Sequence, residues 1–308
     1  MKKRFKSFIM SCFLLVFAFL LMPVVKADAA AVQTKATTSS ITVKWDAKED
    51  ALNYKVYVGK DYSSLKLYKT LEPSVTSVTI KKLPAGCERY VKIAYEYSHS
   101  YNPSKKFEGF VSSVFAKTIP GKVTGVKQER WYYYAKSFNA TWKKFEGADG
   151  YQYIVKTSNG KKKASGIVKY NGNSLSVDKI SNSMVYTVQV RAYVEINGKK
   201  QYGAWSAPGY FFTQPQITKA QVSKNKLTVK WDKVTGATGY DIYVSTKKES
   251  GYKKVKSVGK STSSVTITKM SGKSISDKKQ YYVYVISKKK VGKTTYTSGK
   301  LYYWIARK

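Results

Sequence analysis

The chain has 308 residues, with 56 Lys and Arg against 18 Asp and Glu and a formal charge of +38. Hydrophobic residues make up 43% and aromatic residues 15%, enough for packed cores, so the composition excludes an intrinsically disordered chain despite its charge. One His and two Cys leave almost nothing for a multi-ligand metal site or a His-dependent catalytic triad.

The first thirty residues have the pattern of a secretory signal peptide: four basic residues by position 6, an uncharged apolar run at 8–25, and the small-x-small end Ala27-Asp28-Ala29. An uncleaved membrane anchor is the alternative, because about 18 apolar residues just span a bilayer. Pro23 and the Ala-x-Ala end favour cleavage. We therefore expect residues 1–29 to be removed, leaving an exported chain of 51 basic and 17 acidic residues, +34, with no membrane anchor.

Three segments of the remainder, at 41–58, 138–155 and 227–244, share one pattern. Apolar residues alternate with polar ones up to a Trp, which predicts a strand with one buried face. A Tyr follows nine residues later, after a short loop, and opens a second β-rich run. This predicts two antiparallel strands with the Trp in the core. The pairs are Trp45 and Tyr54, Trp142 and Tyr151, and Trp231 and Tyr240.

The agreement continues downstream of each Trp. A short apolar alternation follows about 35 residues later, and then a strand that opens with Tyr186 in the second repeat and Tyr281 in the third. The core tryptophans are 97 and 89 residues apart. Each repeat is therefore a domain of about ninety residues and not a short solenoid unit.

These landmarks resemble fibronectin type III modules, in particular those of secreted bacterial proteins. The resemblance implies three tandem immunoglobulin-like β-sandwiches, an all-β fold in which the Trp packs beside the third-strand Tyr and a Tyr opening the sixth strand forms a hydrogen-bonded corner. In the first repeat Arg89 stands where that Tyr is expected, with Tyr90 beside it. The implied core residues are Trp45, Tyr54, Trp142, Tyr151, Tyr186, Trp231, Tyr240 and Tyr281.

Proline marks the expected boundaries, because it cannot donate to a strand ladder. Pro120-Gly121 and Pro215 divide the chain into a signal peptide at 1–29 and domains at 30–119, 120–214 and 215–308. The linkers are too short for free tumbling, so we expect a monomeric, extended rod with modest bending.

Residues for catalysis are few. His99 is the only histidine and is expected in a polar turn, and Cys87, the only cysteine left after cleavage, has no disulfide partner. The acidic residues are scattered along the chain, without the spacing of metal ligands. The sequence also lacks the glycine-rich motif of a phosphate-binding loop. We expect no cofactor, no metal and no enzymatic activity; a hydrolase is the last alternative.

Lysine clusters are the surface feature that stands out. One follows the Asn159-Gly160 turn, and three lie in the equivalent turns between the last two strands of each repeat. Since these turns are equivalent, they are expected at the same end of each module. The candidate polyanion-binding residues are Lys105, Lys106, Lys161, Lys162, Lys163, Lys199, Lys200, Lys288, Lys289, Lys290 and Lys293.

The excess of lysine over arginine restricts the classes of binding partner that the sequence supports. After residue 29 the chain has 47 Lys and 4 Arg, whereas reading of base sequence favours the forked arginine side chain. The composition predicts no sequence-specific nucleic-acid binding. The expected partners are anionic cell-wall polymers, acidic polysaccharides or an anionic host surface, met by a protein that is secreted or retained electrostatically at the wall.

Aromatic clusters give the rival hypothesis, a carbohydrate-binding or spacer protein that serves a separate enzyme. Trp131 to Tyr134 and Tyr302 to Trp304 are runs in which consecutive side chains must point to both faces of a strand. The alternative is that they are ordinary core and cross-strand residues. Tyr133 and Tyr303 are the candidate glycan-stacking residues.

Overall fold

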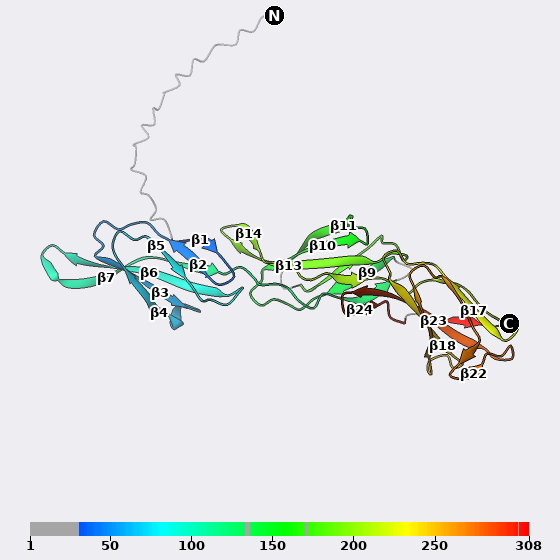
Figure 1. The fold of residues 1–308 in the computed structure, drawn as a ribbon. Coiled ribbons are helices and arrows are strands. Elements are labelled where there is room, and N and C mark those ends of the chain that lie inside the picture. Colours follow the sequence, from blue (N-terminus) through cyan, green and yellow to red (C-terminus); the bar gives the residue numbers. More distant parts are fainter. Residues whose placement is uncertain (1–30, 133–135, 170–171, 301, 308) are drawn as a thin grey trace, which may run out of the picture.

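The computed structural model describes residues 31–132, 136–169, 172–300 and 302–307, whose regular secondary structure is β-strand apart from one 3₁₀ turn. Three β-sandwiches follow one another along an extended rod (Figure 1). The predicted signal peptide at 1–29 lies outside the described residues. Within the described ranges, no helix is long and apolar enough to cross a membrane.

The first sandwich packs a three-stranded sheet of order β1-β2-β5 against a four-stranded sheet of order β4-β3-β6-β7. The hairpin of the two long strands β6 and β7 projects at the end of the rod (Figure 1). The elements are β1 (Val32–Ala36), β2 (Ile41–Lys44), β3 (Asn53–Gly59), the 3₁₀ turn η1 (Tyr62–Ser64), β4 (Lys66–Leu71), β5 (Ser77–Ile80), β6 (Glu88–His99) and β7 (Asn102–Lys117).

The second sandwich repeats this order, with sheets β8-β9-β12 and β11-β10-β13-β14 and an extra strand, β15, that also pairs with β13. Its strands are β8 (Lys127–Tyr132), β9 (Ser137–Thr141), β10 (Gly150–Thr157), β11 (Lys162–Lys169), β12 (Ser174–Val177), β13 (Tyr186–Ile196), β14 (Lys199–Tyr202) and β15 (Gly209–Phe211).

The third sandwich has sheets β16-β17-β20 and β19-β18-β23-β24, with β25 also paired to β23 and a small separate hairpin, β21-β22. Its strands are β16 (Ile217–Ser223), β17 (Lys226–Trp231), β18 (Gly239–Ser245), β19 (Lys253–Gly259), β20 (Ser264–Ile267), β21 (Lys269–Met270), β22 (Lys273–Ser274), β23 (Tyr281–Val291), β24 (Thr294–Thr297) and β25 (Trp304–Ala306).

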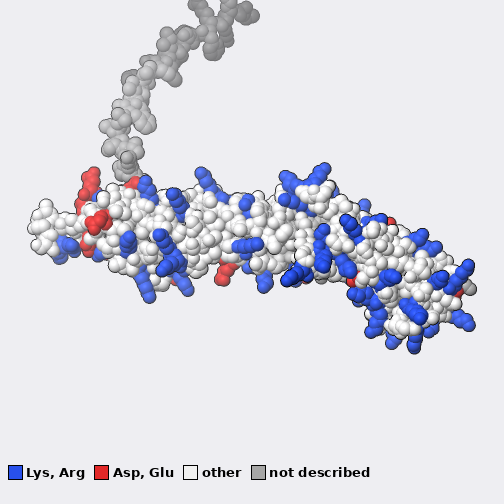
Figure 2. Space-filling view, in the orientation of Figure 1, with Lys and Arg blue, Asp and Glu red and all other residues white. Residues whose placement is uncertain are grey.

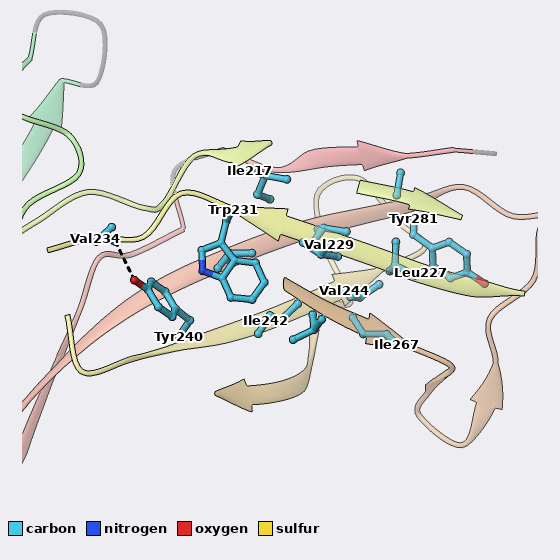
Figure 3. Packing of buried hydrophobic residues seen from close by; sticks show 14 of the residues in the cluster. Ile217, Leu227, Val229, Trp231, Val234, Tyr240, Ile242, Val244, Ile267 and Tyr281 are labelled. Carbon is cyan, nitrogen blue, oxygen red and sulfur yellow. Dashed lines mark hydrogen bonds between the residues drawn. The ribbon is translucent and has the colours of Figure 1, made fainter. Parts of the chain in front are cut away.

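Each core is organised around one Trp–Tyr pair. In β17 the alternation buries Leu227, Val229 and Trp231 and exposes Lys226 and Lys230. Figure 3 shows the indole of Trp231 between the two sheets of the third sandwich, facing Tyr240. The three tryptophans are 2–3% exposed, and the ring centroids of the pairs are 5.5, 5.3 and 5.5 Å apart in chain order.

The tyrosine of each pair also fixes the loop that joins its strand to the preceding one. Its hydroxyl accepts a hydrogen bond from the backbone N–H six residues earlier. The donors are Lys48 at 2.6 Å from Tyr54, Phe145 at 2.6 Å from Tyr151, and Val234 at 2.8 Å from Tyr240. A buried aromatic ring thereby anchors an otherwise irregular loop to the core.

The tyrosine corner is present in two sandwiches. The hydroxyl of Tyr186 accepts from the Ser181 N–H at 2.8 Å, and that of Tyr281 accepts from the Ser276 N–H at 3.0 Å. Both tyrosines are 2–3% exposed.

In the first sandwich a different residue holds the equivalent β5–β6 loop. The Thr118 hydroxyl donates to the Pro84 carbonyl at 2.8 Å and accepts from the Cys87 N–H at 2.9 Å. Tyr90 points elsewhere and donates to the Ser113 hydroxyl at 2.8 Å. The loop is therefore tied to the end of β7 instead of to a tyrosine.

The first junction brings the β5–β6 loop against the β9–β10 loop of the second sandwich. At Gly147, with φ of 77°, a Cβ atom would lie 1.9 Å from the Gly86 carbonyl oxygen, so only glycine fits. Beside this contact, the Lys117 ammonium lies 2.8 Å from the Asp149 carboxylate. Burial lowers the pKa of Lys117, but the hydrogen bond with Asp149 outweighs it and the net shift is upward.

The second junction uses the equivalent loops. The Val185 N–H donates to the Thr235 carbonyl and the Thr235 N–H donates to the Ser183 carbonyl, both at 2.8 Å. Val185 and Phe212 are counted within the buried core of the third sandwich. The junction therefore extends that core into the second sandwich.

At both junctions the β13–β14 or β23–β24 hairpin of the following sandwich also contacts the preceding sandwich. The Asn197 side chain, at the β13–β14 turn, donates to the Gln33 carbonyl at 2.7 Å. On β24, Tyr296 packs against Tyr210 with ring centroids 4.8 Å apart. Two contacts at different points of each interface restrict bending, which accounts for the extended rod.

One glycine distinguishes the docked loops. Gly147 and Gly236 both lie five residues after a core Trp and have φ of 77° and 89°. A Cβ at Gly236 would lie 2.5 Å from the Cβ of Ser158. In the first sandwich Asp50 occupies this place, so its β2–β3 loop lacks the glycine on which both junctions depend.

Replacing Trp142 with Ala should lower the free energy of unfolding of the second sandwich by about 3–5 kcal/mol, because it empties the centre of that core. Urea denaturation of the full chain, followed by fluorescence and circular dichroism, measures the loss. Tyr62→Ala, at a side chain that is 73% exposed, is the control and should change stability by less than about 0.5 kcal/mol. If the second sandwich unfolds at the same urea concentration in the Trp142→Ala protein as in the parent, the assigned core is contradicted.

Replacing Gly147 with Ala should open the first junction while leaving the sandwiches folded. The matched control is Gly160→Ala, whose φ of 85° imposes the same backbone strain at a hairpin tip with nothing within 4 Å. Small-angle X-ray scattering should show a broader distribution of lengths for Gly147→Ala only. Identical scattering curves for the two variants would show that the contact does not hold the rod straight.

Candidate polyanion-binding surface

Positive charge increases along the rod. Between the predicted boundaries, the first domain has 14 basic and 8 acidic residues, the second 15 and 5, and the third 22 and 4, so the net charges are +6, +10 and +18. On the face shown in Figure 2, Lys and Arg occur along the whole rod, and Asp and Glu gather most clearly over the first sandwich. The third sandwich therefore exerts the strongest attraction for anions.

The predicted lysines of the last hairpins belong to the β6–β7, β13–β14 and β23–β24 hairpins, but lie at different points of them. Lys105 and Lys106 lie within β7, where Lys106 pairs with Ser98 of β6, whereas Lys199 and Lys200 begin β14 and Lys293 lies in the β23–β24 turn. Lys288, Lys289 and Lys290 lie within β23 and not in the turn, because β23 and β24 stay paired from Lys288 opposite Thr297 to Val291 opposite Thr294. This corrects their sequence placement.

The hairpin lysines differ in how free their ammonium groups are. Lys106 lies 3.9 Å from Glu96, and Lys200 lies 3.0 Å from Glu195. The Lys105 ammonium lies over the Phe107 ring at 5.2 Å. Exposed pairs of this kind contribute little energy, so a polyanion can displace the carboxylates.

Lys288 is the exception, because it belongs to a largely buried ion pair. Its ammonium lies 2.6 Å from the Asp241 carboxylate, whose side chain is 10% exposed and also accepts from the Ser257 hydroxyl at 2.6 Å. Burial raises the pKa of Asp241, but the hydrogen bonds with Lys288 and Ser257 outweigh it and lower the pKa overall. Lys288 is therefore a structural residue rather than a free binding group.

The same position in the first sandwich has the reversed pair. Lys55 on β3 and Glu96 on β6 lie 2.7 Å apart, and the register aligns Lys55 with Asp241 and Glu96 with Lys288. In the second sandwich the equivalent β10 residue, Gln152, accepts from the Arg191 guanidinium at 2.7 Å.

The remaining predicted lysines flank the β10–β11 turn. Lys161 and Lys162 are exposed, and the Lys163 ammonium donates to the Lys179 carbonyl at 2.7 Å. This turn lies at the end of the second sandwich that meets the third, since Ser158 is beside Gly236. The last hairpin of that sandwich is at the opposite end, where it meets Gln33.

Of the two predicted stacking residues, Tyr133 lies outside the described residues. Tyr303 is half-buried, with its ring 5.4 Å from that of Tyr282 and the Lys248 ammonium 5.9 Å from its centroid. Its neighbours Tyr302 and Trp304 are more exposed, at 50% and 42%.

The sequence reasoning missed Tyr282 and Tyr284, although the run from Tyr281 to Ser287 contains the signal. Tyr281 and Val283 are buried, so the alternate residues Tyr282 and Tyr284 must face away from the core.

His99 and Cys87, the two residues considered for catalysis, lie in the first sandwich. His99 lies at the end of β6, not in a polar turn, and its ring stacks on Tyr101 at 4.9 Å and contacts Tyr97 and Phe107. Cys87 is a half-buried free thiol. Within the described part of the chain, no group of three or more His, Cys, Asp or Glu side chains is placed to hold a metal ion.

Comparisons with known proteins give structural neighbours only. No protein-family profile matches the sequence, and no curated protein matches it. The crystal structure of chicken CNTN1 FN1–FN3 domains is 16% identical, with coverage of 91% of this chain and 98% of that chain and a TM-score of 0.32. A two-domain fibronectin type III segment from chicken tenascin is 15% identical, with coverage of 59% and 97% and a TM-score of 0.33.

Because these scores are low, the fold assignment rests on the strand order and the repeated Trp–Tyr contacts. The described chain is a tandem array of three antiparallel β-sandwiches, each with a Trp–Tyr contact in its core.

Replacing Lys288 with Gln should destabilise the third sandwich by about 1–3 kcal/mol at neutral pH, because Asp241 then stays charged without the ammonium group 2.6 Å from it. Since folding lowers the pKa of Asp241, its contribution is complete above the unfolded pKa and is lost as the pH falls through the folded pKa. The variant and the parent should therefore converge in urea titrations as the pH falls through the lowered pKa of Asp241 in the folded protein. Lys293→Gln, an exposed control, should have no such effect.

Proposed function

We propose that this protein is a non-catalytic, extracellular surface-binding protein whose basic hairpins contact anionic polymers. The observation that carries the proposal is the repetition of exposed lysines at the last hairpin of all three sandwiches, on a chain whose predicted exported part has a net charge of +34. Solubility of a small domain needs a net charge of only about 2–8, which the +10 and +18 of the second and third domains exceed.

The docked junctions support this role. They hold the hairpins at fixed intervals along the rod, so a long polymer can bind several of them at once, which multiplies weak contacts into firm attachment. Lysine supplies compact charges suited to phosphate, carboxylate or sulfate groups without reading a sequence of bases. Retention at an anionic cell wall or host surface follows from the same attraction.

Salt dependence is the direct test. Binding of the exported chain to polyphosphate, polygalacturonate and double-stranded DNA should weaken log-linearly with salt, with a slope set by the number of contacts. Replacing Lys105, Lys199 and Lys293 together with Gln should weaken binding to all three polymers and lower that slope by about 3.

The matched control replaces three exposed lysines away from the hairpins, Lys66, Lys69 and Lys226, and so removes the same charge. Equal losses in the two triple variants would show that net charge acts without the hairpins. If no polymer binds at low salt, the protein is a rigid spacer, a role that the docked junctions favour as the second candidate.

A further inference from the structure

The third sandwich has a group of partly exposed tyrosines on the outer face of its larger sheet. The rings of Tyr252 and Tyr284 are 4.5 Å apart, those of Tyr282 and Tyr303 are 5.4 Å apart, and those of Tyr284 and Tyr303 are 6.3 Å apart. Tyr243, on β18, lies directly opposite Tyr284. We call these five residues the tyrosine face; each is half-buried.

The tyrosine face is not part of the hydrophobic core. Tyr281, Val283 and Val285 of β23 point inward, and Tyr282 and Tyr284 alternate with them. Tyr243 lies likewise between the buried residues Ile242 and Val244. The five phenol rings therefore form an outward aromatic surface that the fold of the core does not require.

Cations surround these rings. The Lys300 ammonium lies 4.4 Å from the Tyr243 centroid, and Lys248 lies over Tyr303. Lys254 is paired with Tyr243 across β18 and β19. Two carboxylates are nearby: Glu249, which is 3.6 Å from Lys248, and Asp241, which is largely buried, engaged by Lys288 and 3.9 Å from the Lys254 ammonium.

A pocket of about 150 Å³ adjoins the tyrosine face at Tyr303. Its walls include the exposed rings of Tyr302 and Trp304 and the linker residues Gln214 and Gln216. The Tyr302 N–H donates to the Gln214 side-chain oxygen at 2.9 Å, which fixes one wall. The volume is below the about 300 Å³ at which pockets for whole ligands begin, so it suits a single ring of a longer molecule.

The corresponding face of the first sandwich is a natural comparison. There Lys92 lies over Tyr57 at 5.1 Å, but it is also 3.5 Å from Glu108, and Lys55 is 2.7 Å from Glu96. Carboxylates neutralise that aromatic face. In the third sandwich the equivalents of Glu96 and Lys92 are Lys288 and Tyr284. Of the two faces compared, the face of the third sandwich is therefore the one that combines aromatic rings with excess positive charge.

We propose that the tyrosine face and its adjoining pocket bind an acidic polysaccharide, a refinement that rests on the proposed polyanion-binding function. Sugar rings stack their apolar C–H faces on the tyrosines, and carboxylate or sulfate groups of the same chain lie near Lys248, Lys254 and Lys300. Charge complementarity with the +18 domain selects an acidic chain over a neutral one. A polyol phosphate chain has no ring to stack.

Four probes separate ring from charge: polygalacturonate has both, polyphosphate only charge, dextran only rings, and oligo-thymidylate charge with flat bases. Tyr303→Ala should weaken polygalacturonate binding by about tenfold, the scale of losing one stacking contact, and leave polyphosphate binding unchanged. Tyr62→Ala, in the first sandwich, should change neither.

A second variant keeps the test valid if Tyr303→Ala fails to fold. Replacing Lys248 and Lys300 with Gln keeps all five tyrosines and should also weaken polygalacturonate binding by about tenfold, with unchanged circular dichroism. The hairpin triple variant should instead weaken polyphosphate and polygalacturonate alike, so failure of the proposed function is visible separately.

Three results would overturn the inference. The first is polygalacturonate affinity within twofold of the parent in both tyrosine-face variants. The second is equal binding of dextran and polygalacturonate. The third is a preference for oligo-thymidylate that Tyr303→Ala abolishes, which would make the tyrosine face a site for single-stranded nucleic acid.

Discussion

The hydrogen bond between a buried tyrosine hydroxyl and a loop N–H six residues earlier is the constraint on which the rod depends. In the second sandwich it fixes Phe145, and Phe145 starts the turn that places Gly147 against Gly86. In the third, Tyr240 fixes Val234 beside Thr235, which pairs with the preceding sandwich. The core of each module thus determines the shape of the surface that its predecessor meets.

Rigid junctions change what the lysine hairpins can do. The hairpins of the second and third sandwiches lie beside junctions, whereas that of the first projects freely. Because their spacing is fixed, a stiff polymer whose anionic groups match it loses little freedom on binding, and a mismatched one cannot engage all three. The third sandwich combines such a hairpin with the tyrosine face, so the proposed selectivity for one polymer would reside mainly there.

The sequence predicts the sandwich architecture well because alternation and the Trp–Tyr interval are local consequences of burial. It does not reveal that Thr118 replaces the tyrosine corner, since that bond joins residues over thirty positions apart. It cannot show why Gly147 must be glycine, because the clash involves the neighbouring module. Lys288 looks like any loop lysine until strand register places it beside Asp241. Tyr282 and Tyr284, by contrast, follow from alternation alone.

The reversed ion pairs bear on how the chain avoids folding incorrectly. Tandem modules with similar strands are prone to exchanging them during folding. If β18 of the third module paired with β6 of the first in the native register, Asp241 would take the place of Lys55, diagonally across from Glu96; the reciprocal exchange would place Lys55 diagonally across from Lys288. Two like charges at a poorly solvated site repel each other strongly. A polarity reversal of this kind disfavours exchange of these strands between the first and third modules.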